Sequence, residues 1–248
     1  MWTRWTQRRP KRRFGWRKKK ILLDSGTPGL SGSRVLSSSG QPFLQRERGP
    51  GRLEAFSDGV FGIAMTLLVL QLVVPGPNSL AGSSLGQELL SLWPSFVAYV
   101  TSFMTILIMW INHHNLFSLV KRVDRPFLFY NGVLLLFTTF VPFPTSLVAD
   151  YLQHRDAGTA TAVYSGTVLL IALSFNLLWR HASGKGGLLD ERVTVDEIRS
   201  ITRQYYVGPS VYAAALVLSF VSPVGSVALC AAVAAFYALT ATLANMRG

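Results

Sequence analysis

Few side chains in this 248-residue sequence have the types and spacing that catalysis requires. The single cysteine, Cys230, excludes a disulfide scaffold and a cysteine-based zinc site. Of the four histidines, the neighbours His113 and His114 cannot face one metal from a regular helix, because adjacent side chains diverge by about 100°. The sequence has no His-Glu-x-x-His motif, phosphate loop, nucleophile elbow or dinucleotide fingerprint. We therefore expect no enzyme, no cofactor and no metal site, and we interpret the histidines as satisfied interfacial residues.

A carboxylate in unusual surroundings, Asp58, is more informative. It ends the run Arg52-Leu-Glu-Ala-Phe-Ser-Asp58, and residues 59–74 after it are almost entirely apolar. A charged side chain within a membrane segment is costly, so its presence marks a functional or structural position. Its role depends on the helices that hold it.

Those helices are predicted from long uncharged runs. Half of the residues are hydrophobic and only 15% are charged, against roughly a quarter in soluble domains. A membrane-spanning helix needs about 20 apolar residues, and the uncharged run 204–246 is twice that length, with a turn signal at 222–225. We therefore expect an all-α membrane protein with six transmembrane helices, at about 54–74, 89–112, 126–149, 157–179, 204–221 and 225–245.

The basic residues are unevenly distributed along the chain. Residues 1–51 contain 13 basic and 2 acidic residues, whereas the other 197 contain 11 and 10. With the N-terminus inside, the outer segments carry only Arg155, so the positive-inside rule predicts that both termini are cytoplasmic. We expect residues 1–50 to form a basic, disordered cytosolic tail that contacts anionic lipid and binds no nucleic acid, and residues 51–248 to form the six-helix domain.

The run that ends at Asp58 resembles the hallmark of the transmembrane protein 175 family of potassium channels, Arg-x-x-x-Phe-Ser-Asp at the start of the first helix. Four residues match this motif: Arg52, Phe56, Ser57 and Asp58. A second resemblance is Trp110-x-x-His113 at the end of the second helix. The resemblance covers about residues 50–246 and implies a bacterial-type, plasma-membrane homotetramer, because the chain has no second copy of the motif.

In that family the first helix of each subunit lines the pore, and bulky aliphatic side chains close it. The resemblance implies Ile63 as the constriction, Thr66 as the residue linked to selectivity, and Leu70 as a further aliphatic pore position. On a regular helix Thr66, Leu67 and Leu70 all fall within about 60° of Ile63, so the four residues form one stripe.

The same geometry separates Asp58 from this stripe. Asp58 falls about 140° away from Ile63 around the helix axis. We therefore expect Asp58 to point into the subunit as a structural residue that holds the helix, with Trp110 and His113 as candidate partners.

The expected function is a leak-type cation channel with imperfect selectivity for potassium. It would have a hydrophobic constriction, which excludes ions when it dewets, and no carbonyl filter loop, since the usual Thr-Val-Gly-Tyr-Gly sequence is absent. Potassium sheds water more readily than sodium, so weak hydroxyl ligands would favour it modestly. A small secondary transporter of the plasma membrane is the alternative, although no internal repeat is evident. An intramembrane enzyme is the third interpretation.

Overall fold

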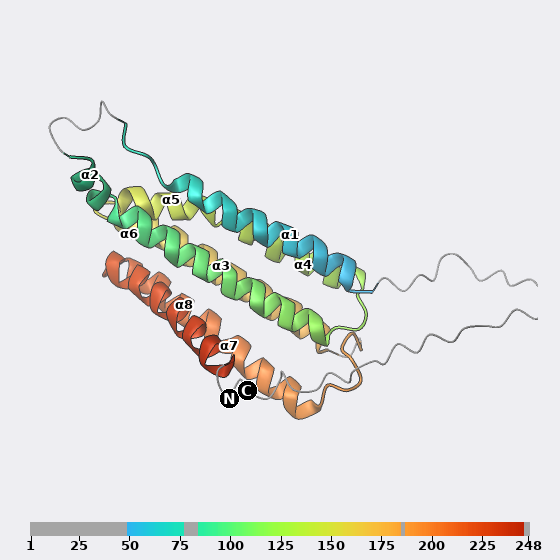
Figure 1. Cartoon of the computed structure of the whole chain (residues 1–248). Coiled ribbons are helices and arrows are strands. Elements are labelled where there is room, and N and C mark those ends of the chain that lie inside the picture. The colour runs from blue at the N-terminus through green and yellow to red at the C-terminus, as the bar shows by residue number, and fades with distance from the viewer. Residues whose placement is uncertain (1–48, 77–83, 185–186, 246–248) are drawn as a thin grey trace, which may run out of the picture.

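The structure is a computed structural model that describes residues 49–76, 84–184 and 187–245, with side chains up to residue 237. The predicted tail lies almost wholly outside these residues, as does the extreme C-terminus. The described part is all-helical (Figure 1). Its elements are α1 (Gly51–Leu67), the 3-10 helix η1 (Leu68–Gln71), α2 (Leu85–Ser91), α3 (Trp93–Leu119), α4 (Arg125–Phe140), α5 (Pro142–Tyr151), α6 (Ala157–Ala182), α7 (Val195–Ser219) and α8 (Pro223–Asn245).

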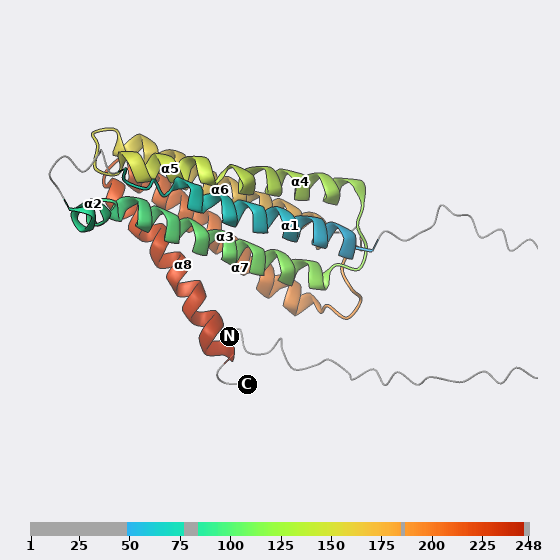
Figure 2. The ribbon, with the colours of Figure 1, turned by 45° about the horizontal axis from the view of Figure 1, so that its top comes forward.

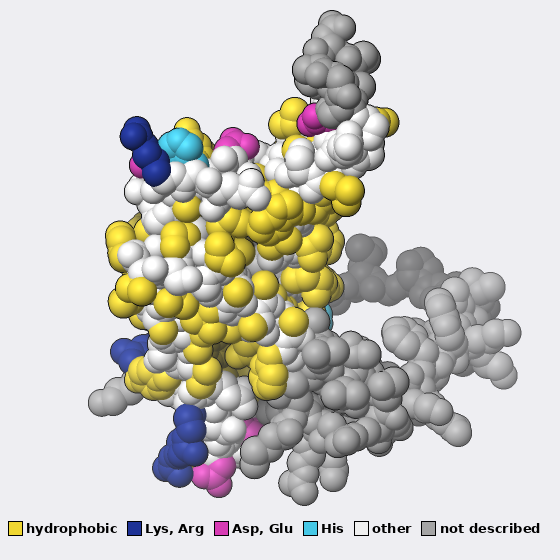
Figure 3. Space-filling model, turned by 90° about the vertical axis from the view of Figure 1, so that its left-hand side faces the viewer, with side chains coloured by type: hydrophobic (Ala, Val, Ile, Leu, Met, Phe, Trp, Pro, Cys, Tyr) yellow, Lys and Arg dark blue, Asp and Glu magenta, His cyan; other side chains and the backbone are white. Residues whose placement is uncertain are grey.

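Four helical spans of the described chain are long and apolar enough to cross a membrane. They are Gly51–Gln71, Trp93–Leu119, Arg125–Tyr151 and Ala157–Ala182. Apolar side chains cover the middle of the face in Figure 3, and charged side chains lie mostly toward its upper and lower edges. Two further helices, α7 and α8, follow these spans, so the expectation of six crossings stays a prediction.

Two predicted helices are less regular than expected. The first is α-helical only to Leu67 and then tightens into η1, which ends at Gln71. Pro75 disfavours helical backbone at Val74, so the helix could not extend to its predicted end. The third is interrupted at Val141, where α4 ends and α5 begins. Pro142 has no N–H to donate to Thr138 O, which instead accepts from the Val141 N–H at 3.2 Å.

The fifth helix begins earlier than predicted and the turn after it lies as expected. α7 starts at Val195, because Thr194 and Glu197 form a capping box that continues the helix into charged sequence. The turn before α8 follows Ser219, and Ser222 Oγ accepts from the Gly225 N–H at 3.2 Å. A Cβ at Gly225 would lie 2.8 Å from that hydroxyl, so a larger residue here would have to displace Ser222 Oγ from this bond.

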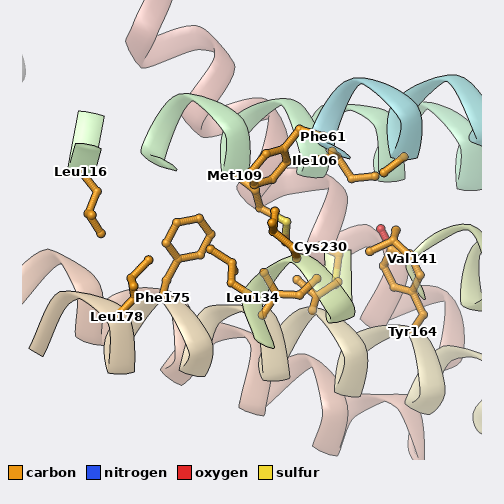
Figure 4. Packing of buried hydrophobic residues seen from close by; sticks show 14 of the residues in the cluster. Phe61, Ile106, Met109, Leu116, Leu134, Val141, Tyr164, Phe175, Leu178 and Cys230 are labelled. Atoms are coloured by element: carbon orange, nitrogen blue, oxygen red, sulfur yellow. The ribbon is translucent and has the colours of Figure 1, made fainter. Parts of the chain in front are cut away.

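The bundle places α1 and α7 on opposite sides. α1 packs against α3 and α4, while α6 packs against α4, α5, α7 and α8. Figures 1 and 2 both show α1 at the α3–α4 side, with α7 and α8 beyond α3 and α6. Buried apolar side chains, among them Phe61, Ile106 and Leu134, join these layers (Figure 4).

Candidate functional site

The two faces of α1 differ sharply. One face is buried against α3 and α4 by four side chains: Ser57, Phe61, Ala64 and Leu68. The other face carries the stripe that the sequence singled out, and all of it lies on the subunit surface. The exposed fractions are 59% for Ile63, 41% for Leu67 and 70% for Leu70, and Thr66 is exposed beside them.

The stripe keeps its alignment where the helix tightens. Leu70 lies in η1, and in a 3-10 helix side chains three residues apart are eclipsed, so Leu70 lies directly above Leu67. Thr66 Oγ1 donates its proton to Ile63 O at 2.9 Å, and this bond fixes the hydroxyl. The lone pairs of Thr66 Oγ1 are therefore free to accept from water or to bind a cation.

Asp58 lies on the packed side of α1, half-buried, against α3. Trp110 Nε1 donates a hydrogen bond to Asp58 Oδ1 at 2.9 Å. Of the two partners proposed from the sequence, Trp110 is therefore the one in contact. His113 is not hydrogen-bonded to Asp58 and belongs to a second, deeper set of bonds.

That deeper set joins three helices through an amide. The buried His113 on α3 is 2.9 Å from Asn131 Oδ1 on α4, and Asn131 Nδ2 donates to Ser57 Oγ on α1 at 3.0 Å. Ser57 Oγ donates in turn to Leu53 O at 2.9 Å. Because the amide nitrogen of Asn131 already donates, its oxygen is the acceptor and His113 carries a proton on Nε2. The network links Ser57, from the motif, to His113, from the second motif.

Asn131 was missed by the sequence analysis, although it is the centre of this network. The signal that could have found it was a lone amide within the uncharged run 126–149. A buried polar side chain within a membrane segment needs partners on neighbouring helices.

A contact between His114 and Glu54, at the same end of α1, was also missed. His114 Nδ1 lies 2.9 Å from Glu54 Oε1, and the His114 ring stacks on Trp110 with 6.2 Å between ring centroids. Arg52, the first motif residue, is exposed and has no hydrogen bond or ion pair to another described residue. In the ranges that the structure describes, no group of three or more His, Cys, Asp or Glu residues could hold a metal ion.

The loops at this end of the bundle carry two carboxylates with perturbed pKa values. Desolvation opposes ionisation of Asp124, but the Phe127 N–H and His181 bond to its carboxylate and hold its pKa below the ordinary value. The hydrogen bonds of Arg192 lower the pKa of Asp190 to about 2. Both groups therefore stay ionised at neutral pH, Asp124 as the cap of α4.

Comparisons with known proteins give a consistent result. Residues 52–142 match the family described as endosomal/lysosomal potassium channel TMEM175. A protein of Chamaesiphon minutus named as a potassium channel is 51% identical over 189 residues, which cover 76% of this chain and 93% of that protein. A Streptomyces collinus protein, also named as a potassium channel, is 45% identical over 69% of this chain and 83% of its own length.

A solved structure is similar to this fold. It is described as a lysosomal potassium-selective channel TMEM175 homolog from Chamaesiphon minutus. The TM-score is 0.71 at 49% sequence identity, and the match covers 77% of this chain and 96% of that chain.

Proposed function

This chain belongs to the TMEM175 family, and from that membership we propose that it is a cation channel that conducts potassium with imperfect selectivity over sodium. The channel is a leak-type channel of a bacterial plasma membrane. Its constriction is hydrophobic and lies on α1, and it has no carbonyl filter loop.

One observation carries this proposal: α1 is packed by polar and apolar contacts on one face and exposes an apolar stripe on the other. A single subunit cannot enclose a pore with one helix. In a homotetramer the four α1 helices meet at the central axis, and each exposed stripe then faces its three copies. The polar contacts on the opposite face set the rotation of α1, which keeps Ile63, Leu67 and Leu70 toward the axis.

The side chains of the stripe have two roles: the apolar ones close the pore, and Thr66 selects the ion. Rings of Ile63, Leu67 and Leu70 form a narrow neck that water leaves readily, and a dewetted neck stops ions. The Thr66 hydroxyls have free lone pairs because their protons are donated to Ile63 O at 2.9 Å. Four such oxygens offer weak ligands to a partly dehydrated cation, which favours potassium modestly because potassium loses water more easily than sodium.

The orientation in the membrane follows from charge. α7 and α8 are the fifth and sixth crossings, and the first part of α7 lies in the cytosol because its charged residues all precede Gln204. Both termini are cytoplasmic under the positive-inside rule. The end of the bundle that holds Glu54, His114 and Asp124 is then the cytosolic end.

Two measurements on the purified full-length protein test the proposal. Native mass spectrometry should detect a tetramer. Liposomes with potassium on one side and sodium on the other should show a reversal potential that is displaced from zero toward the potassium equilibrium potential. A protein that is only monomeric would remove the pore altogether. Saturable counterflow exchange without unitary currents would replace the channel by a transporter.

A further inference from the structure

We propose that the cytosolic end of the α6–α7 face binds an anionic phospholipid, with Arg180 and Arg203 as ligands of its phosphate and Tyr206 between them. These three residues are called the arginine site below. The inference rests on the proposed membrane orientation, and it adds a ligand on the side of the subunit away from α1.

The geometry of the arginine site is set by contacts between α6 and α7. Arg180, in the last turn of α6, donates from Nη2 to Tyr206 Oη, and its Cζ lies 5.3 Å from the centroid of the Tyr206 ring. Arg203 lies one turn before Tyr206 on α7, so their side chains share a face. Both arginines are exposed.

Two interhelical bonds beside the arginine site hold its halves together. Trp179 Nε1 donates to Thr202 Oγ1 at 2.9 Å, and Asn176 Nδ2 donates to Tyr205 O at 2.6 Å. These two bonds hold the backbone of α6 near Arg180 against the backbone of α7 near Arg203. Two guanidinium groups on neighbouring helices are suited to phosphate, because each group presents a planar fork of donors.

The charges of the arginine site are available for a ligand, unlike those of its neighbours. Neither Arg180 nor Arg203 has a carboxylate partner among the residues that the structure describes. On or just before α7, Arg192 pairs with Asp190 at 3.0 Å and Arg199 with Asp196 at 3.4 Å, whereas Arg52, Arg122 and Arg125, which lie on or beside other helices, have no carboxylate partner among the described residues either. An anion that reaches the α6–α7 face at this end therefore finds positive charge without a carboxylate partner at Arg180 and Arg203.

An apolar surface continues from the arginine site toward the middle of the membrane. On α6 the exposed side chains follow one face in the order Leu170, Leu173, Leu177 and then Arg180. On α7 the exposed Val207 and Val217 continue the face of Arg203 in the same direction. The uncharged run that begins at Gln204 puts the boundary between polar and apolar sequence at this level. An acyl chain can lie along the leucines while its phosphate lies at the arginines, an arrangement that suits a phospholipid better than a free anion.

The test is lipid retention by the full chain in native mass spectrometry, with phosphatidylglycerol and phosphatidylcholine titrated separately. The test variant is R180Q/R203Q. The control variant R192Q/R199Q removes the same charge from the same end, but at arginines that are already paired. Each cation near a membrane surface contributes about 1 kcal/mol, so the test variant should lose roughly thirtyfold in phosphatidylglycerol binding. The control variant and all phosphatidylcholine titrations should change by less than about threefold.

Three results would overturn the proposal. They are equal losses in the test and control variants, equal retention of the two lipids by the unmodified chain, and displacement of phosphatidylglycerol by inorganic phosphate at equal concentration. R203Q alone guards against a folding defect, since Arg203 has no hydrogen bond or ion pair to another described residue, and it should lose about fivefold. The same spectra report the tetramer mass. A tetramer that does not bind phosphatidylglycerol selectively would contradict the lipid site and leave the channel proposal intact. A monomer that binds phosphatidylglycerol selectively would contradict the channel proposal and leave the lipid site intact.

Discussion

The two faces of α1 have opposite requirements. On the face toward α3 and α4 the polar side chains have hydrogen-bond partners. Ser57 Oγ accepts from the Asn131 amide, and Asp58 Oδ1 accepts from the Trp110 indole. The outer face exposes Ile63 and Leu70 by more than half of their surfaces and has one hydroxyl, Thr66, bonded to its own backbone. The packed face is specific because hydrogen bonds have direction, whereas apolar contact alone would let the helix slide or rotate.

Directional contacts on one face explain how a membrane helix can present a chosen stripe on the other. An apolar helix has no strong preference for one rotation in lipid, since lipid tails and leucines are equally apolar. A rotation by one residue, about 100°, would carry Ile63 away from the proposed pore axis and would also break both polar contacts. The motif residues on the packed face therefore determine the direction in which the outer face points. Variants on each face can test the two roles separately.

The largest effect is expected from the amide that joins three helices. Asn131→Ala leaves His113 Nε2 buried without a partner, and an unsatisfied buried polar group costs about 1–3 kcal/mol. The variant also removes the donor to Ser57 Oγ, which keeps its bond to Leu53 O. Hydrogen bonds between membrane helices are worth less on average, about 0.6 kcal/mol, so we expect a total loss near 2 kcal/mol, or roughly thirtyfold in the unfolding equilibrium. Denaturant unfolding in detergent measures it.

Asn115→Ala is the matched control, because Asn115 is exposed on α3 and the substitution is the same. Its unfolding midpoint should be unchanged. Equal destabilisation by the two variants would mean that the amide network does not hold α1.

The outer face is expected to respond next, in conduction and not in stability. Ile63→Asn replaces a ring of apolar side chains by amides that retain water in the neck, so leak current should rise by about tenfold or more. Unfolding of the subunit should stay the same, because Ile63 is 59% exposed in it. The tetramer mass is measured in parallel to check that the assembly persists.

Leu170→Asn makes a comparable polar change on the exposed face of α6, away from α1. It should leave the leak current unchanged. If it raises the current as much as Ile63→Asn does, the neck is not at α1.

A smaller effect is expected at Asp58. Asp58→Asn keeps an oxygen that can accept from Trp110 Nε1, but removes the charge that strengthens this bond. The loss should be about 1 kcal/mol, roughly fivefold in the unfolding equilibrium. The potassium-to-sodium preference of the remaining tetramer should not change. A shifted preference in a fully stable tetramer would contradict the assignment of Asp58 to the packed face.

The sequence was sufficient for the features that depend on local pattern. Apolar runs of membrane length located the four spans, and the 100° rotation of a helix separated Asp58 from Ile63 and pointed to Trp110. It was insufficient where one residue decides, as at Pro142 within the third span and at the Thr194 cap of α7. It also missed Asn131, whose partners lie 18 and 74 residues away in the chain. No local pattern contains such contacts, because packing creates them.

The smallest effect, and the most specific one, is expected from the hydroxyl of the stripe. Thr66→Val keeps the shape but removes the oxygen that would face the cation, so the potassium-to-sodium permeability ratio should fall by about twofold while current persists. Reversal potentials under bi-ionic conditions measure this ratio independently of expression. Thr139→Val is the control, because Thr139 is also exposed and donates to Leu136 O at 2.9 Å, the same local bond that Thr66 makes with Ile63. A shift in the Thr139 variant alone, or in neither variant, would show that the hydroxyl of α1 does not select the ion, and a shift on changing Leu67 or Leu70 instead would move the selecting position along the stripe.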